Sequence, residues 1–459
     1  MKQQKYYFES DFVVKKINPS LVIIFGFIVF ILSGALLLSL PISLNDPKSS
    51  INFVDAIFTS ASAVCVTGLI VKDTATFFSP FGKLIIMILI QIGGLGYIMI
   101  STFFTLAITK RIDSNIRFQT LQEFQKFSSK EIRSYLVKLL LFVFSVELLG
   151  SFIMFFRFSK VYPDFMKVLF YSLFHSISAF CNAGFSTFST NLYDYRNDPF
   201  IVLTVSSLIV IGGLGFIAIR DIYKNKFYYK RLKSHTKIVL IMTSLLIIIP
   251  FFLFFIFETN SSLKEFDIFG KILNTIFQII TPRTAGFNTI NFALLKNSTI
   301  FLLMILMFIG ASPGGTGGGI KTTTFYLVVS YMVNNLRGRK NLNIFRRRID
   351  EEITTKSYFI FTISILVFIL AILILLFTEN QDPFKIFFEV VSAYGTVGLS
   401  LGGDLPNVSL AANFTPFGKI IIIFVMLVGR VGVLTAVNIF LTKDKKDSFQ
   451  YPKANVLVG

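Results

Sequence analysis

Cysteine, histidine and tryptophan are almost missing from this sequence, which contains two Cys, two His and no Trp among 459 residues. Two cysteines, Cys65 and Cys181, are too few for a disulfide scaffold or for a metal site built from thiolates. His175 and His235 stand far apart, without the short spacing that a pair of metal ligands needs. We therefore expect a protein that is not an enzyme and that binds no cofactor of its own.

Charged residues are scarce as well, at 15% of the chain, whereas apolar residues make up 54% and include 56 Phe. The mean hydropathy is +0.71, and repeated apolar stretches are long enough to cross a lipid bilayer. The first, over residues 21–40, follows Lys15 and Lys16 but lacks a small-residue cleavage site, so we expect a membrane helix and not a removed signal peptide. These features predict a multi-pass membrane protein.

Acidic residues are too few to balance the basic ones: 25 Asp and Glu oppose 44 Lys and Arg, giving a formal net charge of +19. A nucleic-acid partner is not expected, because no patch of interleaved basic and aromatic residues is present in the sequence. The basic residues instead gather in segments that should share one side of the membrane, which predicts that this side, with both termini, is cytoplasmic and faces anionic lipid. Together these segments hold 29 of the 44 basic residues and 11 of the acids; they are residues 1–20, 110–138, 220–237, 334–356 and 443–459.

One short stretch occurs four times, with glycines that lie 116, 102 and 112 residues apart. A short apolar segment precedes every copy, and Ser-Ala stands six and five residues before the glycine in all but the third, which has Ile280-Thr281. Extended strands of this kind can line a cation path with backbone carbonyls, and glycine allows backbone angles that a Cβ opposes. The alternative, four incidental loop glycines, does not explain the shared phasing. The copies are Val66-Thr67-Gly68-Leu69, Asn182-Ala183-Gly184-Phe185, Thr284-Ala285-Gly286-Phe287 and Thr396-Val397-Gly398-Leu399.

The periodicity predicts an all-α polytopic membrane protein in which four pore-type repeats surround a central pore, with eight transmembrane spans. Each repeat would contain a membrane helix, a half-helix, a filter strand and a second membrane helix. The half-helices are too short to span, and backbone that is not helical at that depth must line water or be buried in protein. Their negative carboxyl ends would converge on a dehydrated cation. The repeats are assigned to residues 21–110, 134–224, 236–334 and 354–442, between cytoplasmic segments 1–20 and 443–459.

A further glycine motif lies in three of the expected second helices. Because glycines allow close approach of helices in lipid, we expect a packing role for the first two copies. The second helices are expected near residues 82–108, 200–219, 299–333 and 417–441. The motif reads Gly93-Gly94-Leu95-Gly96, Gly212-Gly213-Leu214-Gly215 and Gly429-Arg430-Val431-Gly432.

In the third repeat, the motif is replaced by six glycines and a proline within residues 310–320, which cannot continue a helix. We expect a loop at membrane depth that gates the path below the filter; the alternative is a packing kink, for which one Pro or Gly would suffice. Arg430 would limit cation passage by its charge, pin loop carbonyls, or serve packing only. Lys321 would act in the gate or extend to the cytoplasmic surface. The candidate gate residues are Gly310, Ser312, Pro313, Gly314, Gly315, Thr316, Gly317, Gly318, Gly319, Lys321 and Arg430.

Two other charged residues fall at membrane depth in this plan. Arg283, just before the third filter strand, is expected to cap half-helix carbonyls. Glu147 is the one acid placed within a span, and we expect it to act in packing or in a dimer contact because a proton relay would need more than one acid. The glycine-rich run lacks the Gly-Lys-Ser/Thr pattern of a phosphate-binding loop, so no nucleotide site is expected in this chain.

A unit of helix, half-helix, Thr-Val-Gly-like strand and helix resembles the pore unit of potassium channels. Four such units in one chain, with one glycine per strand, resemble the Trk/Ktr/HKT superfamily of cation transporters, and the eight-span plan is most similar to its bacterial Ktr-type translocating subunits. The resemblance covers nearly the whole chain. It implies potassium uptake across the bacterial plasma membrane, an intramembrane gate at the glycine-rich loop, a homodimer, and a cytosolic ring of RCK subunits through which alone nucleotides would act.

The resemblance also implies that the filter carbonyls bind potassium. Sodium-selective members of the superfamily carry serine in the first filter, where this chain has Gly68, so potassium is favoured. The alternative is a secondary transporter that couples sodium or protons to its solute, since broken helices also build midplane sites in such proteins. Four copies of one unit favour the channel-like path, whereas inverted pairs would favour the alternative. The expected filter residues are Val66, Thr67, Gly68, Asn182, Ala183, Gly184, Thr284, Ala285, Gly286, Thr396, Val397 and Gly398.

Overall fold

The computed structural model describes residues 19–109, 129–339, 341–404 and 407–437. Regular structure in these ranges is helical, apart from a small hairpin of β1 (Asn343–Ile344) and β2 (Arg347–Arg348). The all-α expectation is therefore confirmed for the described part of the chain. The expected cytoplasmic segments, residues 1–20 and 443–459, lie almost entirely outside the described residues.

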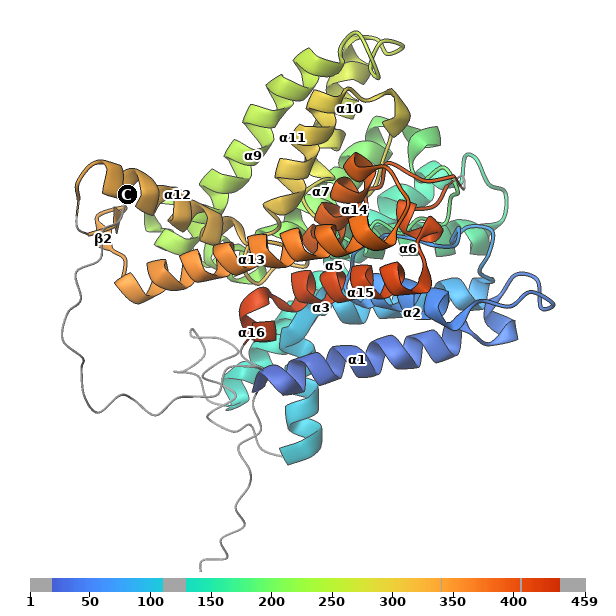
Figure 1. Ribbon diagram of the computed structural model, residues 1–459, viewed down its shortest axis with the longest axis horizontal. Helices are drawn as coiled ribbons and strands as arrows, with labels where there is room; N and C mark the ends of the chain where they lie inside the picture. Colours follow the sequence, from blue (N-terminus) through green and yellow to red (C-terminus); the bar gives the residue numbers. More distant parts are fainter. Residues whose placement is uncertain (1–18, 110–128, 340, 405–406, 438–459) are drawn as a thin grey trace, which may run out of the picture.

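Each quarter contains a long helix, a short helix and an interrupted second helix, in that order along the chain (Figure 1). The first quarter contains α1 (Pro19–Leu38), α2 (Phe53–Val64) and α3 (Pro80–Thr109); the second contains α5 (Ser129–Phe158), α6 (Phe165–Cys181), α7 (Pro199–Leu214) and α8 (Phe216–Lys224); the third contains α9 (Ser234–Glu258), α10 (Ile268–Ile280), α11 (Asn297–Phe308) and α12 (Thr322–Leu336); the fourth contains α13 (Glu351–Thr378), α14 (Pro383–Gly395), α15 (Pro416–Val431) and α16 (Val433–Val437).

Within the described ranges, four helices, α1, α5, α9 and α13, are long and apolar enough to cross a membrane, and the pair α7–α8 would add a fifth if its two halves are counted together. Their outward faces expose large apolar side chains, including Phe25, Leu148, Phe252 and Leu370. Such a surface is unfavourable in water but suits the hydrocarbon of a bilayer. The long helices thus form an apolar outer layer around the shorter elements.

The short helices α2, α6, α10 and α14 each begin at an Asn or Asp whose side chain accepts backbone N–H groups of the first turn. These N-caps are Asn52, Asp164, Asp267 and Asp382. The caps satisfy donors that the helix itself leaves free, and they fix where each half-helix starts. Each half-helix leads directly into one of the four repeated stretches, and its last turn is buried.

Three of the second helices, expected as single membrane helices near 82–108, 200–219 and 417–441, are not continuous in the structure. They break at the last glycine of each motif copy, where φ is +77° at Gly96, +88° at Gly215 and +91° at Gly432. Only glycine adopts these angles without steric cost. At Gly215 the chain turns by 93° between α7 and α8. The motif therefore ends helices as well as packing them.

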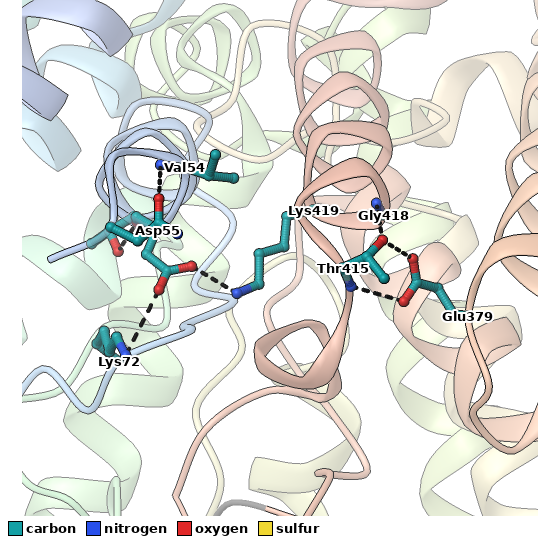
Figure 2. A network of polar contacts seen from close by, with 9 residues as sticks. Val54, Asp55, Lys72, Glu379, Thr415, Gly418 and Lys419 are labelled. Carbon is teal, nitrogen blue, oxygen red and sulfur yellow. Dashed lines mark hydrogen bonds and ion pairs between the residues drawn. The ribbon is translucent and has the colours of Figure 1, made fainter.

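The four quarters close into a ring. Neighbouring quarters meet through α3 and α6, α7 and α10, α11 and α14, and finally α15 and α2. Figure 1 shows the last contact directly, with α15 near the end of the chain lying beside α2 near its start. The ion pair of Lys419 Nζ with Asp55 Oδ1, 2.7 Å long, joins these two helices, and Lys72 lies 3.7 Å from Asp55 Oδ2 (Figure 2).

Polar contacts also fasten the end of each later long helix to the start of its second helix. Arg157 at the end of α5 pairs with Asp198, the N-cap of α7, at 2.6 Å. Glu258 at the end of α9 accepts from Lys296 N and Thr299 before and within α11. Glu379 after α13 accepts from Thr415 N at 2.9 Å and from its hydroxyl at 2.6 Å (Figure 2). These clamps hold the outer ends of the helices in register around the buried strands.

Candidate ion pathway

The four repeated glycines lie together in one ring. A Cβ built on Gly68 would strike the carbonyl oxygen of Ala183, and one on Gly184 would strike that of Ala285. In the same way Gly286 faces the carbonyl of Val397, and Gly398 faces that of Thr67. Each glycine thus touches the strand of the next quarter, and the fourth touches the first. These contacts bring eight of the twelve expected filter residues together, and the other four, Val66, Asn182, Thr284 and Thr396, stand two positions before the glycines.

Two backbone features make these strands possible. All four glycines have positive φ, from +68° at Gly184 to +92° at Gly68. The residues two positions earlier, Val66, Asn182, Thr284 and Thr396, also have positive φ, between +50° and +78°. A left-handed conformation is uncommon for side chains with a branched Cβ, so it persists only where surrounding structure fixes it.

Hydroxyl groups at the ends of the half-helices provide that support. Ser62 Oγ accepts from Gly68 N at 3.0 Å, and Ser392 Oγ accepts from Gly398 N at 3.0 Å. Ser178 Oγ donates to the Phe185 carbonyl at 2.8 Å. In the third quarter, where the Ser-Ala pattern fails, Thr281 Oγ1 donates to the Phe287 carbonyl at 2.5 Å. The sequence marked these positions by their phasing, but it did not indicate their role or the substitution by Thr281.

An open cavity of about 500 Å³ lies at one end of the ring. The four glycines line it together with residues that follow them in each quarter, among them Ser186, Asn288 and Ser400. Asp73 is the acidic residue of this lining, and its carboxylate accepts from the Ser189 hydroxyl of the next quarter at 2.6 Å. A polar cavity that opens onto a ring of backbone carbonyls is suited to receive a hydrated cation.

The glycine-rich loop between α11 and α12 covers the opposite end of the strands. Gly318 N donates to Thr396 Oγ1 at 2.9 Å, and Gly317 packs directly against Thr284 Oγ1. Asn182 Oδ1 accepts from Thr284 Oγ1 at 3.0 Å when the amide is oriented so that its nitrogen donates to the Ala179 and Ile209 carbonyls. The loop therefore lies against the repeated strands at the end away from the cavity and touches two of them.

The rest of the loop is held mainly by the second quarter. Thr316 N and Ser312 N donate to the carbonyls of Gly212 and Gly213 at 3.1 Å and 3.0 Å, and Thr316 Oγ1 donates to the last-turn carbonyl of Phe180. Phe216 N donates to Gly314 O at 3.1 Å, just after the break at Gly215. Two hydrogen bonds lie within the loop: Gly310 N donates to Ile320 O, and Gly315 N donates to Ser312 O. Two further contacts reach other quarters: Gly319 N donates to Gly429 O of the fourth quarter, and Pro313 O lies against Gly215 of the second.

Arg430 and Lys321 both bind loop carbonyls. The Arg430 guanidinium, 8% exposed, donates to Thr316 O of the loop and to Gly93 O of the first quarter. Lys321 Nζ donates to Gly317 O at 2.7 Å, so its charge is directed into the loop and not toward the surface. Of the roles considered for Arg430, this geometry agrees with pinning loop carbonyls. A single guanidinium joins the loop to two other quarters because its donors point in several directions.

Arg283 and Glu147 occupy other places. Arg283 is buried and its Nη2 lies 3.4 Å from Thr243 Oγ1 on α9; no described half-helix carbonyl accepts from its side chain, so the capping expectation is wrong there. Glu147 is buried between α5 and α6, where its Oε1 lies 3.8 Å from Cys181 Sγ and its backbone carbonyl accepts from Ser176 Oγ. These contacts agree with the expected packing role. Among the residues described here, no cluster of His, Cys, Asp and Glu could hold a metal ion.

The first glycine of each helix motif explains how the strands and second helices fit together. A Cβ on Gly93, Gly212 or Gly429 would strike the carbonyl of Val64, Phe180 or Tyr394, each in the last turn of a half-helix. These contacts agree with the expected close packing. In the first, second and fourth quarters the motif therefore brings the second helix against the carboxyl end of its own half-helix.

The chain is similar to known proteins in sequence and in fold. Residues 9–451 match the TrkH family, described as cation transport proteins. The chain is 38% identical over 455 residues to the Ktr system potassium uptake protein B of Bacillus subtilis, which spans 98% of this chain and 99% of that protein. It is 34% identical to the potassium/sodium uptake protein NtpJ of Enterococcus hirae, over 97% of this chain and 98% of that protein. The crystal structure of the potassium transporter TrkH from Vibrio parahaemolyticus matches with a TM-score of 0.71 and 21% identity, covering 94% of this chain and 86% of that one.

The structural match shows a shared fold, and the family match covers nearly all of the sequence. The apolar outer helices agree with the transport of ions across a membrane. This chain therefore belongs to the TrkH family of cation transport proteins.

Proposed function

We propose that this protein is the channel-like, potassium-translocating subunit of a Ktr-type uptake system in a bacterial plasma membrane. The observation that carries the proposal is the closed ring in which each of four glycines abuts a backbone carbonyl of the next quarter. Carbonyls in such a ring replace the hydration shell of a potassium ion, and the cavity of about 500 Å³ would deliver the ion. Relatives named for potassium uptake support the choice of ion.

The proposed membrane arrangement has eight spans in four pore repeats, with boundaries near 21–110, 134–224, 236–334 and 354–442. Each interrupted second helix would count as one span, and both termini would be cytoplasmic. The breaks at the motif glycines are compatible with this arrangement, because broken helices at membrane depth are tolerated where protein buries them. The loop of residues 310–320 would be the gate, since it closes one end of the filter strands and is held by Arg430.

We further propose a homodimer that is regulated by a cytosolic ring of RCK-type subunits, which would supply any response to nucleotides. The name of the relatives, a Ktr system, supports association with other subunits. The β1–β2 hairpin is a suitable docking point, because Arg346, Arg347 and Arg348 are exposed there and present three positive charges. Phe345 and Arg346 form its tight turn, both with positive φ.

Charge reversal of Arg346, Arg347 and Arg348 to Glu tests the docking point. We expect the variant to reach the membrane normally but to lose co-purification with the ring at physiological salt. The hairpin would remain folded, since its exposed side chains contribute little to stability. Retention of the ring by the variant would mean that these charges serve lipid contact.

Rescue of a potassium-uptake-deficient bacterial strain tests the main proposal. Growth at low potassium should return when this chain is expressed, more strongly with a candidate ring subunit. Failure to restore growth, with the protein present in the membrane together with each candidate ring subunit, would contradict the proposal.

A second candidate, sodium-coupled uptake, has one observation in its favour: 34% identity to a protein named for potassium and sodium uptake. Rescue that requires external sodium would support it.

A further inference from the structure

The lower rim of the filter is formed by Val66, Asn182, Thr284 and Thr396, which occupy equivalent positions in the four strands. All four are buried and have positive φ. Three of them carry polar side chains, so the rim needs hydrogen-bond partners in order to hold its conformation. The Asn182 amide and the Thr284 hydroxyl satisfy each other across 3.0 Å.

The partner of the fourth strand comes from the gate loop. Gly318 N donates to Thr396 Oγ1 at 2.9 Å. A Cβ on Gly318 would lie 2.5 Å from the same oxygen, and one on Gly317 would lie 2.6 Å from Thr284 Cβ. The backbone of Gly317 and Gly318 is therefore fitted against the side chains of two adjacent filter strands, at a distance that only glycine permits.

Gly317 and Gly319, on either side of Gly318, are anchored to the gate's own supports. Lys321 Nζ donates to Gly317 O at 2.7 Å, and Gly319 N donates to Gly429 O at 3.2 Å, next to Arg430. Any movement that withdraws these anchors also withdraws the donor to Thr396. The Thr396 strand would then lose the hydrogen bond that holds its side chain from below.

We propose that the gate loop is also part of the filter, so that its position sets potassium-over-sodium discrimination as well as flux. The coupling acts through the contacts of Gly318 with Thr396 and of Gly317 with Thr284. This inference rests on the proposed function of the ring as a filter and of the loop as a gate. Thr396 is a positioning residue in this scheme, because it acts through the loop.

Substitutions at Thr396 separate the contribution of its hydroxyl group from that of its side-chain shape. Thr396→Val keeps the shape of the side chain but removes the acceptor, whereas Thr396→Ser keeps the hydroxyl. We expect Thr396→Val to raise potassium uptake about fivefold, the effect of losing one buried hydrogen bond, and to lower the potassium-to-sodium uptake ratio. Thr396→Ser should restore both quantities to within about twofold of the native values. Gly318→Ala, which pushes the loop away from Thr396, should repeat the effect of Thr396→Val independently.

The decisive comparison places Thr396→Val in a chain that lacks residues 310–319, with protein in the membrane quantified by immunoblot. If the coupling is correct, the deletion raises flux and lowers the ratio, and Thr396→Val then changes neither quantity further. If Thr396→Val lowers the ratio equally with and without the loop, Thr396 acts on the ions directly and the coupling is wrong, although the filter stands. If the deleted chain reaches the membrane but carries no potassium, the loop is not a gate and both proposals fail.

Discussion

Each of the four repeated glycines is required by the group that lies beside it. Gly68 has φ of +92°, and the space where a Cβ would stand is occupied by the Ala183 carbonyl. The sequence predicted this requirement because glycine recurred in phase four times. It did not predict that each glycine faces the next quarter, since that contact arises only when the ring closes.

Gly68→Ser tests the requirement. The new side chain must displace the Ala183 carbonyl, so we expect the potassium-to-sodium uptake ratio to fall roughly tenfold, as about 1–3 kcal/mol of overpacking would give. Gly338→Ser is the matched control, because Gly338 also has a positive φ, of +67°, but a Cβ there meets nothing within 4 Å. Unchanged potassium and sodium kinetics in Gly68→Ser would remove Gly68 from the filter.

Thr281 shows what the sequence left unresolved at the residue scale. The third quarter departs from the Ser-Ala pattern, and the structure shows that a threonine one position later supplies the hydroxyl to the Phe287 carbonyl. A repeated sequence motif cannot predict this replacement. The hydrogen bond depends on where the hydroxyl oxygen lies in space, and a residue at a neighbouring sequence position can place its oxygen at the same point.

Thr281→Val keeps the side-chain volume and removes this hydroxyl. We expect about 1–3 kcal/mol of destabilisation, measured as a lower thermal midpoint in detergent, together with a reduced potassium-to-sodium uptake ratio. Thr281→Ser should retain both properties. A native midpoint and ratio in the valine variant would show that the Phe287 carbonyl needs no anchor.

The sequence predicted the helices well where hydrophobic periodicity and the length of the apolar run determine whether a helix forms. The sequence predicted one short apolar half-helix before each repeated strand, and α2, α6, α10 and α14 occupy these places. The breaks in the second helices were not predicted. Their glycines stand in apolar runs, where a packing role and a helix break give the same sequence, and only the positive φ at Gly96, Gly215 and Gly432 distinguishes them.

Arg430 links three of these elements, because its guanidinium joins α15 to the loop and to α3. Arg430→Ala should free the loop and raise potassium uptake. Arg430→Lys distinguishes an effect of the positive charge from an effect of pinning the loop, because a lysine keeps the charge but cannot bind two separated carbonyls in the same way. We expect the lysine variant to behave like alanine if pinning dominates. Uptake that is unchanged or lower in Arg430→Ala, at native levels in the membrane, would contradict the role of the arginine in the gate.

At the scale of the whole molecule, ring closure depends on contacts between the two ends of the chain. Lys419 and Asp55 are 364 positions apart, and their ion pair joins the fourth quarter to the first. No sequence pattern pointed to this pair, because charges so distant in the chain give no periodic signal. The order of quarters around the ring likewise became visible only in the structure.

Lys419→Met tests the closure. Asp55 would remain largely buried with only the more distant Lys72, so we expect a loss of about 2 kcal/mol, less than the ~3–5 kcal/mol of a fully unpaired buried charge. Lys72→Met, on the more exposed side of the same acid, should cost no more than about 1 kcal/mol. Thermal unfolding in detergent measures both. Equal midpoints for native protein and Lys419→Met would mean that helix packing alone closes the ring.

The most direct measurement is the position of a bound ion in the ring of four glycines. Rubidium resembles potassium and can be located by its anomalous X-ray scattering in crystals grown without sodium. We expect a peak among the strands, at the level of the Thr67, Ala183, Ala285 and Val397 carbonyls, which weakens when potassium is added and persists when sodium is added. A ring without a peak, or a peak that sodium displaces as readily as potassium, would contradict a potassium filter at this site.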